Sequence, residues 1–146
     1  MTRKRDKIVE GFFEEEVLSV FGRSIAFEGR LSTEFDELKK KLDSDLKDLR
    51  EKELKLFSDE VEGAFAGKSE DERKKFDQYR AELSITREKL ETEIFAKIAG
   101  RFKTLSGELE KGIEALKVDI ESVKKTTQFF ETLARVVGII ARILVL

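Results

Sequence analysis

The chain has 146 residues, of which 41% are charged, and it contains no proline, cysteine or histidine. Average usage would supply about seven prolines, and no useful stretch shows the period-two alternation of a strand, so we expect an all-α fold. The missing histidine and cysteine remove the commonest catalytic base, metal ligand and thiol. The net charge of −2 gives no general attraction to nucleic acid. We therefore expect no enzyme activity, cofactor, metal, nucleic-acid partner or small-molecule substrate.

Residues 1–21 form a basic end followed by an amphipathic segment that predicts a first helix, with Gly22 as its stop. The segment between Gly22 and Gly29 predicts a break. No apolar run reaches the length of a signal peptide or a spanning helix, so we expect a cytoplasmic protein with a peripheral contact to a membrane as a further hypothesis. The candidate contacts in this segment are the basic residues Arg3, Lys4 and Arg5 and the apolar residues Ile8, Phe12 and Phe13.

Residues 31–66 predict the first arm of a helical hairpin, because leucine and phenylalanine recur there at helical spacing. A turn is predicted after this arm. Gly67 suits the left-handed end of a helix, and Ser69 with Glu72 matches a capping box that begins the next one. A hairpin centred on this turn pairs residue n with about residue 135−n.

Residues 69–128 predict the second arm. An apolar stripe runs from Phe76 to Leu144, mostly in steps of three, four or seven residues, and one face of one or more collinear helices must therefore be apolar. The sequence leaves open whether this arm is one continuous helix or breaks at Gly100, Gly107 or Gly112.

Residues 129–146 form the most apolar part of the chain and predict an amphipathic helix. The predicted hairpin register leaves residues 136–146 without a partner, so we expect their apolar face to meet lipid or another protein surface. A tail anchor is the third alternative. The predicted contacts are Phe129, Phe130, Leu133, Val136, Val137, Ile140, Ile143 and Leu144, with Arg135 and Arg142 facing lipid headgroups.

The whole chain, residues 1–146, is thus expected to form one all-α domain, an elongated antiparallel helical hairpin or coiled-coil-like bundle that assembles with copies of itself. Two functions fit this architecture. The first is a self-assembling scaffold that acts at an anionic membrane surface through its amphipathic terminal segments. The second is a soluble assembly subunit or adaptor whose C-terminal tail binds protein.

Overall fold

The computed structural model describes residues 25–122 and 125–145, and this part of the chain is all-helical. The predicted first helix, with Arg3, Lys4, Arg5, Ile8, Phe12 and Phe13, lies outside the described residues. Contacts divide the chain into two units, residues 1–37 and residues 38–146, and the packing described below is that of the second. The five helices are α2 (Ile25–Leu56), α3 (Asp59–Ala66), α4 (Glu70–Thr92), α5 (Phe95–Glu121) and α6 (Thr126–Leu144).

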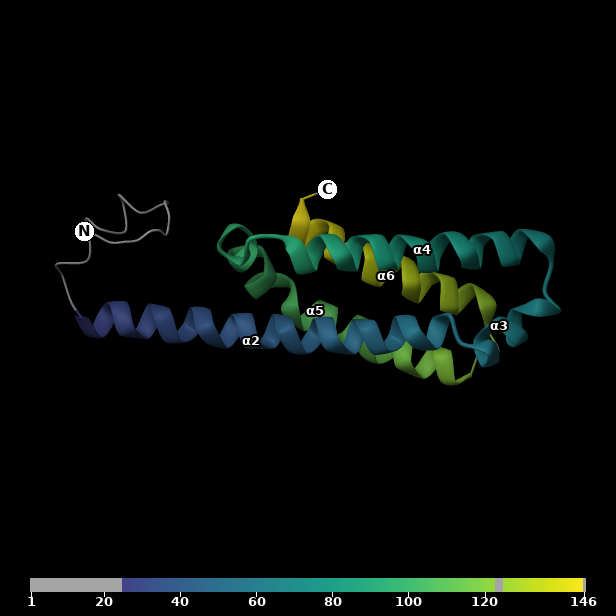
Figure 1. Ribbon diagram of the computed structural model, residues 1–146, viewed down its shortest axis with the longest axis horizontal. Helices are drawn as coiled ribbons and strands as arrows, with labels where there is room; N and C mark the ends of the chain where they lie inside the picture. The colour runs from purple at the N-terminus through teal and green to yellow at the C-terminus, as the bar shows by residue number, and fades with distance from the viewer. Residues whose placement is uncertain (1–24, 123–124, 146) are drawn as a thin grey trace. The chain divides into compact units, whose positions relative to one another are not determined.

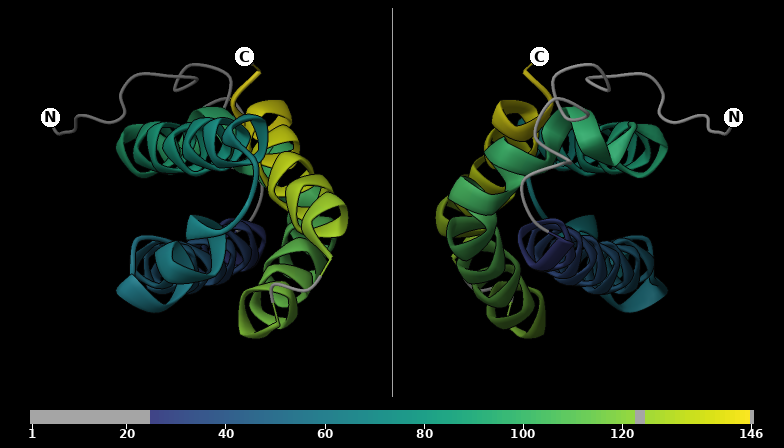
Figure 2. Two further views of the ribbon diagram at one scale, coloured as in Figure 1. Left: turned by 90° about the vertical axis from the view of Figure 1, so that its right-hand side faces the viewer. Right: turned by 90° about the vertical axis from the view of Figure 1, so that its left-hand side faces the viewer.

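Within residues 38–146 the long helices alternate in direction along the chain, as Figure 1 shows. Helix α6 packs against both α4 and α5. Helix α2 lies diagonally opposite α6, with α4 and α5 as its two neighbours (Figure 2). One apolar core runs between the helices. It includes Leu49 of α2, Leu83 of α4, Phe102 of α5 and Ile140 of α6, each with its side chain fully buried.

The predicted turn between the first and second arms is confirmed. The Ser69 hydroxyl accepts a hydrogen bond from the Glu72 backbone N–H at 3.2 Å, and the Glu72 carboxylate accepts one from the Ser69 backbone N–H at 3.3 Å. The predicted register places Glu53 opposite about residue 82, and the observed partners of Glu53 are Ser84 and Arg87. Gly67 has a φ of −90°, so the left-handed conformation predicted for it is wrong.

The first arm differs from its predicted limits at both ends. Helix α2 begins at Ile25, so Gly29 lies inside a helix instead of in a break. The helix ends at Leu56, ten residues before the predicted end, because Ser58 takes an extended conformation and caps α3 by accepting a hydrogen bond from the Val61 N–H at 3.3 Å. A serine followed by acidic residues is the local signal for this cap.

The second arm is two helices and the chain reverses direction between them. Glu93 and Ile94 are both extended, with ψ angles of 147° and 118°, and they separate α4 from α5. The three glycines proposed as break points all lie within α5. At one of them, Gly112, the helix approaches α6 closely, since an added Cβ atom would lie 3.0 Å from Cγ2 of Val136.

Candidate functional site: the seam between α2 and α5

The apolar face of the C-terminal segment is covered by the chain's own helices. Ile140 and Ile143 are fully buried, and the ring of Phe129 lies 5.9 Å from that of Phe76 on α4. The expectation that residues 136–146 find no partner within the chain is therefore wrong for the described residues 136–145. The predicted contacts that are buried are Phe129, Leu133, Val136, Ile140, Ile143 and Leu144, while Phe130 and Val137 are partly buried.

The two basic residues of this segment remain at the surface. Arg135 is exposed, and Arg142 donates a hydrogen bond to Glu108 of α5 at 3.1 Å. They therefore lie on the face of α6 opposite the core, as expected for the polar face of an amphipathic helix. Across residues 25–122 and 125–145, no helix combines the length and apolarity needed to cross a bilayer.

A second surface emerges where α2 and α5 face each other, and we call it the α2–α5 seam. One ion pair crosses it, from Lys41 on α2 to Glu110 on α5. The two helices run in the same direction (Figure 1), and the residues that line the space between them place 45–48 of α2 beside 110–114 of α5 and 51–58 beside 117–121. The charged residues that line the seam are Lys41, Asp45, Asp48, Glu51, Lys52 and Lys55 of α2 and Glu110, Lys111, Glu114, Lys117 and Glu121 of α5.

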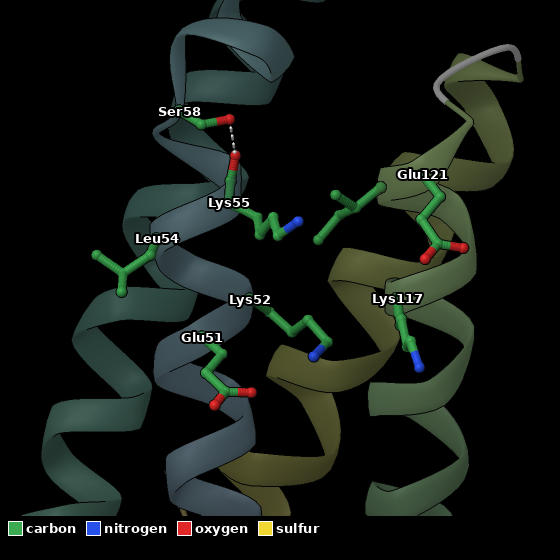
Figure 3. Close-up of a pocket in the computed structure, with 8 residues that line it drawn as sticks. Glu51, Lys52, Leu54, Lys55, Ser58, Lys117 and Glu121 are labelled. Carbon is green, nitrogen blue, oxygen red and sulfur yellow. Dashed lines mark hydrogen bonds between the residues drawn. The ribbon is translucent and has the colours of Figure 1, made fainter.

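One half of the seam is rich in lysine. Lys52 and Lys55 extend from α2 toward α5, and Lys117 and Glu121 project from α5 beside them (Figure 3). A local hydrogen bond fixes the backbone at the end of α2, where the Ser58 hydroxyl donates to the carbonyl oxygen of Lys55 at 2.6 Å. None of the three lysines forms an ion pair with any residue that the structure describes. Three ammonium groups are thus available to an outside partner.

The other half of the seam is acidic. Asp45, Asp48, Glu110 and Glu114 line a pocket there. Asp45 is only 4% exposed, and its Oδ2 atom has no hydrogen-bond partner among the described residues. Burial raises the pKa of Asp45 to about 6; the nearby Lys41 lowers it, and the negative charges of Glu110 and Asp48 raise it. A buried carboxylate without a partner is costly, so this half of the seam favours a cation from outside.

The charges of α2 follow a regular order along the seam. Asp45, Asp48, Lys52 and Lys55 are spaced by three, four and three residues, so they stay on one face of the helix. Along the seam between residues 45 and 55 the negative charges come first, at Asp45, Asp48 and Glu51, and the positive charges second, at Lys52 and Lys55. This pattern was not predicted, because helices are recognised from the spacing of their apolar residues and not from the order of their charged ones. The signal in the sequence is that acidic residues precede lysines on one face of α2 between residues 45 and 55.

No three carboxylates in the described part of the chain gather closely enough to hold a metal ion. Comparison of the chain with protein-family models, curated protein sequences and solved structures finds no match. The chemistry that the seam offers is ionic recognition, with an acidic half and a lysine-rich half on one surface.

Proposed function

We propose that this chain is a non-enzymatic structural protein that assembles with copies of itself, and that the α2–α5 seam is its assembly surface. The observation that carries the proposal is a single surface with both kinds of unpartnered charge: the Asp45 carboxylate at one end and the ammonium groups of Lys52, Lys55 and Lys117 at the other. Complementary charge across an interface steers association and selects the partner.

The seam replaces the C-terminal tail as the expected protein contact. Fully burying an aliphatic or aromatic side chain contributes about 1.5–3 kcal/mol, so exposing the apolar face of α6 would cost roughly 10 kcal/mol or more. The total stability of a typical domain is only about 5–15 kcal/mol. Helix α6 is therefore better suited to hold the monomer together than to join monomers.

The test of self-assembly is the molar mass in solution. We expect light scattering after size exclusion to report a species larger than the 16.8 kDa chain at low salt, and a shift toward the monomer at high salt. The salt effect follows from the screening of the seam charges. A protein that stays monomeric at every concentration and salt level would contradict the proposal.

The second candidate is the scaffold at a membrane surface, and the strong amphipathicity of α6 favours it. Arg135 and Arg142 lie opposite a continuous apolar face, as in helices that rest at a lipid interface. Because that face is turned toward α4 and α5, lipid binding through it requires α6 to leave the bundle. The free energy gained when these side chains enter lipid would have to exceed the free energy of packing that the core loses.

This second candidate has its own test. The chain has no cysteine, so Glu108→Cys with Arg142→Cys can be joined by a short bismaleimide that fastens α6 to α5. We expect the unlinked double variant to float with anionic vesicles and the linked one to remain in the soluble fraction. Flotation of both would exclude release of α6, and flotation of neither would exclude the membrane function.

A further inference from the structure

We propose that the acidic half of the α2–α5 seam binds an aliphatic diamine, a ligand with two ammonium groups joined by a short hydrocarbon chain. The site is the pocket between α2 and α5, which is lined by Asp45, Asp48, Glu110, Lys111, Ile113 and Glu114. All of these residues belong to one chain, so the inference goes beyond the proposed self-assembly and does not depend on it.

The buried carboxylate of Asp45 is the first observation. Asp45 is 4% exposed and lines the pocket, and its Oδ2 atom accepts no hydrogen bond from any described residue. Lys41, one turn away on the same helix, donates a hydrogen bond to Glu110 instead. Buried polar atoms without a partner are uncommon in folded proteins, and an ammonium group that enters the pocket supplies the missing donor.

The charges around the pocket do not balance. Asp48 and Glu114 also form no ion pair with any residue that the structure describes. When ionised, the four carboxylates of the lining carry four negative charges, and the lysines beside them, Lys41 and Lys111, carry two positive ones. Two negative charges are left over. A ligand with two positive charges would therefore neutralise the pocket.

The spacing of the carboxylates suits two ammonium groups. Asp45 and Asp48 are three residues apart on α2, and Glu110 and Glu114 are four apart on α5, which separates the members of each pair by about 4.5–6 Å along the helix axis. A diamine whose hydrocarbon chain matches the four-carbon stem of lysine spans this distance. One ammonium group can then lie near Asp45 and Glu110, and the other near Asp48 and Glu114.

The lining favours a diamine over other cations. No three carboxylates in the described part of the chain gather closely, so the pocket lacks the compact set of oxygen ligands that a calcium ion prefers. No aromatic ring among the described residues lines it, as a site for a quaternary ammonium group would require. Ile113 offers an apolar wall to the methylene groups, and the volume of about 420 Å³ is typical of small-molecule sites.

Isothermal titration calorimetry of the full chain with putrescine, at pH 8 and low salt, tests the site. We expect putrescine to bind at least about 10-fold more tightly than butylamine, which carries a single ammonium group on the same hydrocarbon chain. Mg²⁺ has the same charge as putrescine but no hydrocarbon chain, and we expect it to bind at least about 10-fold more weakly.

A double variant removes the charge of two carboxylates from the pocket. Neither Asp48 nor Glu114 is buried or ion-paired among the described residues, so Asp48→Asn with Glu114→Gln should keep its helix content. We expect it to bind putrescine at least about 10-fold more weakly. The matched control is Asp43→Asn with Glu88→Gln, which makes the same change in net charge at exposed positions outside the pocket and should bind putrescine like the original chain.

The pH dependence of binding reports on Asp45 itself. Burial raises its pKa to about 6, and the charged groups that face it from α2 and α5 are Lys41, Asp48, Glu110, Lys111 and Glu114. At pH 5 only about a tenth of Asp45 is ionised, while aliphatic amines stay charged at both pH values, so the affinity for putrescine should fall about 10-fold from pH 8 to pH 5. Asp45→Asn should bind weakly at both pH values and lose most of this difference.

The outcomes are distinct from those of the self-assembly test. Binding that weakens in the pocket variant but not in the control supports the site. Equal affinities for putrescine, butylamine and Mg²⁺ would show only a general attraction of cations and would overturn the proposal. Equal binding of putrescine by the pocket variant and the control, or no binding by the original chain at millimolar concentration, would overturn it as well. The molar mass of the chain in solution tests self-assembly separately.

Discussion

Lys41 and Asp45 lie one turn apart on α2, but the ammonium group of Lys41 donates its hydrogen bond to Glu110 of α5, and Oδ2 of Asp45 is buried with no hydrogen-bond partner among the described residues. The pKa of Asp45 is raised from 3.8 to about 6, chiefly by this burial. The folded chain therefore binds the Asp45 proton more tightly than the unfolded chain does, and ionising Asp45 reduces stability.

Replacement of Asp45 with asparagine should stabilise the monomer at pH 8. The stability that protonated Asp45 contributes is complete below pH 3.8 and is lost as the pH rises to about 6. Since the adjoining pocket is open to solvent, we expect less than the full penalty, about 1–2 kcal/mol. Urea unfolding at pH 8 and at pH 4.5 should show a gain for Asp45→Asn that shrinks at the lower pH.

The control for this substitution is Asp43→Asn, two residues away on an exposed part of α2. Asp43 accepts a hydrogen bond from Lys39 at 2.7 Å, and both side chains are about half exposed, so its effect should stay within about 0.5 kcal/mol. A stability loss at pH 8 for Asp45→Asn would show that the carboxylate has a partner, either within the folded chain or from a second copy.

The ion pair between Glu53 and Arg87 fastens α2 to α4. Glu53 is 8% exposed and accepts hydrogen bonds from Nη2 of Arg87 at 3.0 Å and from the Ser84 hydroxyl at 2.9 Å. Glu53→Ala would leave the mostly buried Arg87 with Glu91 as its remaining partner, and we expect a loss of about 2 kcal/mol. Adding Arg87→Met should recover part of that loss, which a double-mutant cycle in urea would measure. Strict additivity of the two substitutions would contradict a coupled pair.

The turn and the register of α2 against α4 could be predicted because their signals are local. A serine three residues before a glutamate sets the start of α4, and the position of this turn fixes which residues of the two helices meet. The break at Ser58 carries the same kind of local signal. Helix content followed from composition alone, since nothing in the chain except glycine disfavours a helix.

The reversal between α4 and α5 had no such signal. Leu90, Ile94 and Ile98 keep the four-residue spacing of a helix across the break, and neither glycine nor proline marks it. The reversal is set by packing, because it lets α6 lie against both α4 and α5 and bury the face that a straight arm would expose. The same packing places α5 beside α2, so the seam could not be predicted from a straight hairpin.

Gly112 and Gly107 offer a matched pair within α5. An added Cβ atom at Gly107 meets nothing within 4 Å, so Gly107→Ala should stabilise the chain by up to about 1 kcal/mol through helix propensity. At Gly112 the same atom would lie 3.0 Å from Cγ2 of the buried Val136, and crowding should outweigh the gain, with a net loss of about 1 kcal/mol.

Thermal unfolding of both alanine variants measures this difference. Val136→Ala should be less harmful in the Gly112→Ala background than in the original chain, because the smaller side chain makes room for the new methyl group. Equal gains from the two glycine substitutions would mean that α5 and α6 are not in close contact at this point.

A substitution at Ile140 tests whether the apolar face of α6 is buried within the monomer. Its side chain is fully buried, so Ile140→Asp places a charge in the core and should cost more than about 4 kcal/mol, with loss of helix in circular dichroism. Val145 is the control on the same helix end: it is 66% exposed and has a φ of 61°, a left-handed conformation that aspartate tolerates better than valine. Val145→Asp should therefore be neutral or slightly stabilising. If Ile140→Asp instead keeps its helix content and melting temperature while losing assembly or vesicle flotation, the face of α6 is free in the monomer and the tail, not the seam, makes the contact.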